Sequence, residues 1–116
     1  DYGMITLLFQ KDVAGLEVAD KNGQWHTVEP ENDAIVINTG DLMERWTNGR
    51  FRSTPHRVQP KMGSDDRYSM AMFVDPDSAT PISVLESCRD PGEALRFQDI
   101  SAGDYIQERI LASHKS

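Results

Sequence analysis

Cysteine is nearly missing from this sequence of 116 residues, in which Cys88 is the single example. One thiol cannot form a disulfide within the chain. Disulfides persist mainly in oxidising compartments, and a reducing, cytoplasmic location is therefore the simplest expectation.

Long apolar runs and an excess of positive charge are missing as well. No stretch reaches the roughly 18 apolar residues of a membrane-spanning helix, and nothing resembles a signal peptide. Lysine and arginine number 12 against 19 aspartates and glutamates, which gives a net charge of -7. Such a surface repels phosphate groups, so the sequence predicts neither a nucleic-acid partner nor a membrane partner.

An initiator methionine is also missing. The sequence starts at Asp1 and runs directly into the apolar segment "YGMITLLF". We therefore expect this chain to be part of a longer protein and to need the N-terminal part of that protein for activity. Its length is that of one domain or part of one, and it contains no repeat or linker.

Short strand-like segments separated by turn residues predict a mainly β fold of the sandwich or barrel type with a C-terminal helix. The expected strands cover residues 4–9, 15–20, 25–28, 34–38, 67–74 and 82–85. "KNGQ" predicts a hairpin between the second and third of these, and the apolar "AIVIN" predicts a strand buried on both faces. A short helical turn is expected over Asp41–Trp46, and a helix capped by Ser101 and Asp104 is expected over about 101–113.

Strand alternation places Arg67 and Ser69 of "RYSMAMF" on one face. A guanidinium binds a carboxylate through a planar fork, and a hydroxyl two residues further on can add a hydrogen bond. These two residues therefore predict a carboxylate pocket. The alternative is a surface arginine that pairs with Asp65 or Asp66 and a serine bonded to its own backbone.

A hairpin between "HRVQ" and "RYSM", with its turn near Met62-Gly63 in the loop over residues 60–66, would place His56 opposite Ser69. A histidine beside a carboxylate pocket suggests a metal, and two histidines with one carboxylate form the iron site of non-haem oxygenases. The carboxylate would come from another strand. A single histidine next to a proline is, however, more often structural, and neither His26 nor His114 is a good second ligand.

The ordered segments "DYGMITLLFQ", "GLEV", "GQWHTVEP", "AIVINTGDLMERWTNGRFRSTPHRV" and "DRYSMAMFVDP" cover about residues 1–77. In this order they resemble the C-terminal half of the isopenicillin-N-synthase-like 2-oxoglutarate and Fe(II)-dependent dioxygenases. The resemblance implies the C-terminal portion of a jelly roll, or double-stranded β-helix. We expect a partial jelly-roll core over residues 1–85 and a C-terminal extension over 86–116.

The resemblance also implies the roles of the site residues. Asp1 matches the aspartate of the family's His-x-Asp motif and His56 its distal histidine, so both would bind Fe(II). Arg67 and Ser69 match the pair that holds the far carboxylate of 2-oxoglutarate. The first histidine would stand two residues before Asp1, outside this chain, so the chain by itself supplies two of three ligands.

The expected activity is oxygenation of a small organic substrate with O2, coupled to decarboxylation of 2-oxoglutarate to succinate and CO2. We expect no catalytic residue beyond the metal ligands, while Met4, Thr6 and Phe73 are candidates to line the substrate site. Two alternatives remain open. One is an oxidase of the same fold that does not use 2-oxoglutarate, and the other is a jelly-roll binding module without metal.

Overall fold

The computed structural model describes residues 1–59 and 66–114, and within them strands outnumber helices. The strands are β1 (Ile5–Lys11), β2 (Leu16–Ala19), β3 (Trp25–Thr27), β4 (Val36–Thr39), β5 (His56–Val58), β6 (Tyr68–Val74), β7 (Pro81–Ile82) and β8 (Ile100–Ser101). The helices are α1 (Asp41–Trp46), α2 (Ala102–Ser113) and a 3₁₀ turn over Glu86–Cys88. The expected mainly β fold with a C-terminal helix is therefore confirmed.

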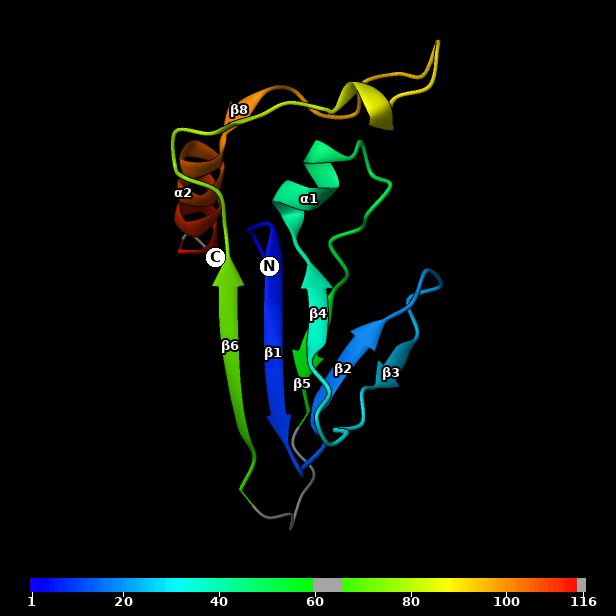
Figure 1. The fold of residues 1–116 in the computed structure, drawn as a ribbon, viewed down its shortest axis with the longest axis vertical. Helices are drawn as coiled ribbons and strands as arrows, with labels where there is room; N and C mark the ends of the chain where they lie inside the picture. Colours follow the sequence, from blue (N-terminus) through cyan, green and yellow to red (C-terminus); the bar gives the residue numbers. More distant parts are fainter. Residues whose placement is uncertain (60–65, 115–116) are drawn as a thin grey trace. The chain divides into compact units, whose positions relative to one another are not determined.

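The strands of the described residues form three small sheets (Figure 1). Two of them have three strands, in the orders β4-β1-β6 and β3-β2-β5, and the third pairs β7 with β8. β2 and β3 form the predicted antiparallel hairpin, and Gly23 of its turn has a φ of 81°. That left-handed conformation explains why the turn carries Asn22-Gly23.

The hairpin expected between the segments of β5 and β6 is wrong. β5 pairs with β2 instead, and His56 lies opposite Val18 rather than Ser69. β6 is a strand of the other three-stranded sheet. Nine residues separate Val58 from Tyr68, and a connection of that length does not specify a register as a two-residue turn does. The turn residues Met62 and Gly63 lie outside the described residues.

The expectation of a strand at 34–38 that is buried on both faces is also wrong. The strand covers Val36–Thr39, and the side chains of Ile35 and Ile37 are 48% and 64% exposed. An apolar run of strand length needs a covering layer on each face. The run itself does not specify which segment supplies that layer.

The chain divides into two compact units, which are described separately. The first consists of residues 1–6 and 39–53 together with the segment from Phe73 onward, and the second of residues 7–38 and the described part of 54–72. Leu42, Ile82 and Ala102 form the core of the first unit. The second unit buries Ala14, Leu16 and Ala19. The domain boundary expected between residues 85 and 86 stays a prediction.

Both helices of the first unit begin as the sequence predicted. α1 covers Asp41–Trp46, as expected. In α2 the Ser101 hydroxyl oxygen accepts a hydrogen bond from the backbone N–H of Asp104 at 3.2 Å, which satisfies one N–H of the first turn. No helix of the described residues is long and apolar enough to cross a membrane.

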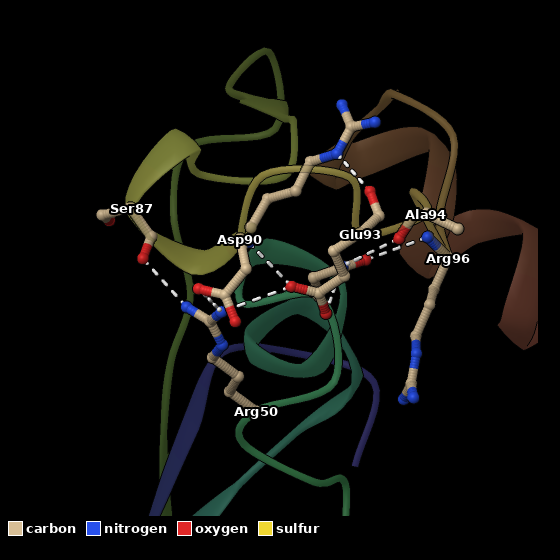
Figure 2. Close-up of polar contacts among 8 residues, drawn as sticks. Arg50, Ser87, Asp90, Glu93, Ala94 and Arg96 are labelled. Carbon is tan, nitrogen blue, oxygen red and sulfur yellow. Dashed lines mark hydrogen bonds and ion pairs between the residues drawn. The ribbon is translucent and has the colours of Figure 1, made fainter.

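A polar network attaches the segment around Glu93 to the end of α1 (Figure 2). Arg50 donates to the carbonyl oxygen of Ser87 at 2.9 Å and forms ion pairs with Asp90 and Glu93 at 3.2 and 3.3 Å. The buried Asn48 accepts from the Arg96 backbone N–H at 2.9 Å. These contacts hold an otherwise irregular segment on the first unit.

Candidate functional site

Asp1 lies four residues before β1 in the first unit, and a hydrogen bond orients its carboxylate. The Thr6 hydroxyl donates a hydrogen bond to the Asp1 Oδ2 atom at 2.7 Å. Thr6 is 6% exposed, so its hydroxyl is held within the unit. Thr6 was expected on the substrate side, and no pattern in the sequence indicates that its hydroxyl orients a carboxylate.

The main chain of Asp1 and Gly3 is held by the start of α1. The backbone N–H of Asp41 donates to the Asp1 carbonyl oxygen at 2.9 Å, and that of Leu42 donates to the Gly3 carbonyl oxygen at 3.0 Å. The first N–H groups of a helix have no acceptor inside the helix. These two bonds therefore pair N–H groups at the start of α1 with carbonyl oxygens of the N-terminal segment. A side chain at Gly40 would overlap the Gly3 carbonyl oxygen, which explains the glycine at the position before α1.

His56 is the first residue of β5 and is half-buried in the second unit. Its Nδ1 atom lies 3.3 Å from the carbonyl oxygen of Thr54. With the Nδ1 proton directed at that oxygen, the lone pair lies on Nε2, as in metal-binding histidines. The ring orientation therefore fits the role of a metal ligand.

Arg67 stands directly before β6, and its side chain is held by residues around β1. The Nη2 atom of Arg67 donates a hydrogen bond to the Oε1 atom of Gln10, 3.3 Å away. A Cβ atom on the buried Gly15 would come within 2.6 Å of the Arg67 Cδ atom and 2.7 Å of its Nε atom. Glycine at position 15 thus leaves the space that the arginine stem occupies.

The Nε atom of Arg67 is buried and has no hydrogen-bond partner among the residues that the structure describes. Buried donors are normally paired, and an unpaired one costs about 1–3 kcal/mol. Ser69 follows in β6 on the same face by strand alternation, and it is exposed. This donor and the nearby hydroxyl fit the binding of a carboxylate.

The structure locates the four candidate residues in two units. Asp1 belongs to the first unit, and His56, Arg67 and Ser69 belong to the second. Among the described residues, no group of three or more His, Cys, Asp or Glu side chains could hold a metal ion. Iron binding by Asp1 and His56 stays a prediction.

An open pocket of about 580 Å³ lies beside Asp1 in the first unit. Its lining residues are Asp1, Tyr2, Gly3, Phe73, Asp75, Ile106 and Ile110. Phe73, a candidate substrate-lining residue, is one of them, whereas Met4 packs against the core cluster. Two isoleucines from α2 make part of this pocket apolar, and no local pattern in the sequence indicates this contribution.

The other two histidines have local roles. The His26 Nε2 atom lies 2.7 Å from the Asp20 Oδ2 atom, and this hydrogen bond is the main cause that lowers the pKa of the Asp20 carboxyl. His114 is the C-cap of α2. The expectation that neither residue is a substitute ligand stays a prediction.

No signal in the sequence singles out Gln10 or Thr54, because their contacts with Arg67 and His56 follow from strand pairing and chain direction. Gly15 has a recognisable signal, since an isolated glycine at the edge of a strand often marks a close approach by another segment. The sequence does not indicate which segment makes that approach.

Comparison with known proteins relates this site to a family. The sequence profile of the 2OG-Fe(II) oxygenase superfamily matches residues 1–76. The 2-oxoglutarate-Fe(II) type oxidoreductase ppzD of Metarhizium majus is 39% identical over 121 residues, which cover 98% of this chain and 35% of ppzD. The chain therefore spans about a third of the length of this relative.

Solved structures of related proteins have similar folds. A full-length Neurospora crassa protein, solved in complex with alpha-KG, is 36% identical with a TM-score of 0.88, over 97% of this chain and 36% of the Neurospora protein. The rice dioxygenase for auxin oxidation is 32% identical with a TM-score of 0.86, over 97% of this chain and 39% of the rice protein. The expected C-terminal portion of a jelly roll is confirmed by these neighbours.

Proposed function

Because this chain belongs to the 2OG-Fe(II) oxygenase superfamily, we propose that the whole protein catalyses Fe(II)- and 2-oxoglutarate-dependent oxygenation of a small organic substrate. The reaction consumes O2 and converts 2-oxoglutarate to succinate and CO2. One observation carries the proposal: the match over residues 1–76 includes all four candidate site residues, Asp1, His56, Arg67 and Ser69.

Asp1 and His56 are two of the iron ligands in this proposal, and the third is a histidine two positions before Asp1 in the whole protein. An imidazole and a carboxylate are the donor types of the 2-His-1-carboxylate site. The Thr6 hydroxyl and the Thr54 carbonyl oxygen support the assignment, since outer partners of this kind orient metal ligands.

Arg67 and Ser69 bind the far carboxylate of 2-oxoglutarate in this proposal. The buried Nε atom of Arg67, which has no partner among the described residues, is the donor that supports this role. The Neurospora protein was solved with alpha-KG, which supports the same co-substrate here. When bound, iron and 2-oxoglutarate would activate O2, which is the oxidant, and these side chains would hold the co-substrate in one orientation.

Phe73 is our candidate for the substrate side, because it lines the pocket beside Asp1. Met4 and Thr6 stay candidates for the same side. The cytoplasmic location also stays a proposal, which is supported by the single cysteine of the chain.

The proposal is tested on the purified whole protein by anaerobic titration with Fe(II) and 2-oxoglutarate and then by exposure to O2. We expect a metal-to-ligand charge-transfer band, followed by stoichiometric succinate and CO2. Oxygen consumption without succinate formation would contradict the proposal and indicate an oxidase that does not use 2-oxoglutarate. Absence of iron binding would also contradict the proposal and would indicate a jelly-roll binding module without metal.

Gly15→Ala is expected to destabilise the whole protein by about 1–3 kcal/mol, because the added Cβ overlaps the Arg67 stem. In an Arg67→Ala background the same change should cost far less, since the Cδ and Nε atoms are gone. Urea unfolding of the four proteins measures this coupling. Equal costs in both backgrounds would show that Gly15 does not accommodate Arg67.

A further inference from the structure

Asp41 joins three segments of the first unit through its backbone and carboxylate. Its backbone N–H donates to the Asp1 carbonyl oxygen at 2.9 Å. The Tyr105 hydroxyl donates to its Oδ2 atom at 2.7 Å, and the Ser53 hydroxyl donates to its Oδ1 atom. One residue thus links Asp1 to Tyr105 of α2 and to Ser53.

Ser53 is held firmly between these groups. Its backbone N–H donates to the Glu44 Oε2 atom at 2.6 Å, and its Oγ atom lies 3.4 Å from the Asp1 carbonyl oxygen. A serine hydroxyl has one proton, and a carboxylate is the stronger acceptor, so the proton is directed to Asp41. The Asp1 carbonyl therefore depends mainly on the Asp41 N–H, whose position the two carboxylate bonds stabilise.

Packing also holds the side chain of Tyr105 in position. It lies against the core cluster that contains Leu42 and Ala102. The Arg45 guanidinium lies 5.0 Å from the centre of its ring. A tyrosine phenol keeps its proton at neutral pH in any case, and burial, followed by the adjacent Asp41 carboxylate, raises the pKa of Tyr105 further. Its hydroxyl remains a hydrogen-bond donor throughout the range in which an enzyme of this kind would be assayed.

We propose that Tyr105 and Asp41 are positioning residues for the iron site, through which α2 holds the main chain of Asp1. The inference rests on the proposed function, because that function makes Asp1 an iron ligand. Thr6 restrains the Asp1 side chain and the Tyr105–Asp41 pair restrains its backbone, so the carboxylate keeps one position. α2 lies beyond residues 1–76, so the family match by itself implies no such role for it.

The test uses the whole protein with Tyr105→Phe and, separately, Asp41→Asn. Each substitution keeps the shape of the side chain and weakens the hydrogen bonds that connect Tyr105 to Asp41 and so to Asp1. The readouts are the dissociation constant for Fe(II), from the anaerobic charge-transfer band with saturating 2-oxoglutarate, and the thermal midpoint of the apoprotein. Loss of outer partners costs about 10–100-fold in metal affinity, so we expect at least tenfold weaker Fe(II) binding in each variant.

Arg50→Ala is the matched control, because Arg50 stabilises the same unit through Ser87, Asp90 and Glu93 (Figure 2). We expect it to lower the thermal midpoint and to leave the Fe(II) dissociation constant within twofold of the wild type. A Tyr105→Phe or Asp41→Asn protein that binds Fe(II) as tightly as the wild type would overturn the inference. If the wild-type protein itself shows no band, the proposed function fails and the inference fails with it.

Discussion

Replacing His56 by alanine in the whole protein will abolish the charge-transfer band of the Fe(II)–2-oxoglutarate complex. His56 is one of two proposed ligands in this chain, and with its Nδ1 atom 3.3 Å from the Thr54 carbonyl oxygen, Nε2 is the nitrogen that would bind the metal. Loss of an outer partner alone costs about 10–100-fold in metal affinity, so loss of a ligand should cost more than 100-fold. Anaerobic titration with Fe(II) measures the effect, and succinate formation should fall with it.

His26→Ala is the matched control for this prediction. His26 is an exposed histidine of the same unit, and its contact is with Asp20 rather than with a proposed ligand. This variant should retain the band and the Fe(II) dissociation constant of the wild type. A His56→Ala protein that keeps a normal band would remove His56 from the iron site and leave the family assignment without its distal ligand.

Replacing Arg67 by methionine will raise the KM for 2-oxoglutarate by about 30-fold to several thousand-fold. Truncating one partner of a buried, hydrogen-bonded charge pair costs about 2–5 kcal/mol, and each 1.4 kcal/mol corresponds to a factor of ten. Methionine fills the space of the arginine stem but offers no donor to a carboxylate. Initial rates of succinate formation at varied 2-oxoglutarate give the KM directly.

Two further variants make this result specific. Arg67→Lys keeps the charge and loses the planar fork, so it should give an intermediate KM. Arg57→Met removes an arginine that pairs with Glu17 at 2.8 Å and stacks on Trp25 at 4.1 Å, and it should leave the KM unchanged. A KM for Arg67→Met within threefold of the wild type would exclude Arg67 from the co-substrate site.

The expected and observed structures agree where neighbouring residues determine the conformation. Asn22-Gly23 predicts the β2–β3 hairpin because glycine readily takes up the positive φ that the turn requires. Ser101 predicts the start of α2 because its side chain can reach the N–H of Asp104. Both signals act over a few residues, so they can be interpreted without knowing the rest of the fold.

The disagreements concern partners that are distant in the chain. His56 pairs with Val18 in β2, and no residue near His56 specifies that partner. The exposed Ile37 shows the same limit, because an apolar run predicts a need for burial but not the segment that provides it. The four site residues, Asp1, His56, Arg67 and Ser69, were chosen from strand alternation and family resemblance, and their roles stay predictions.

The sequence by itself indicated most of the strands, both α-helices and the side chains that carry the candidate chemistry, because caps, turns and alternation are interactions between near neighbours. Only the tertiary structure decided what holds those side chains. Thr6 orients Asp1, Gln10 and Gly15 position Arg67, and Tyr105 reaches Asp41 from a helix 64 residues further along the chain. Such contacts depend on strand pairing and helix packing, which are settled by burial across the fold rather than by local sequence.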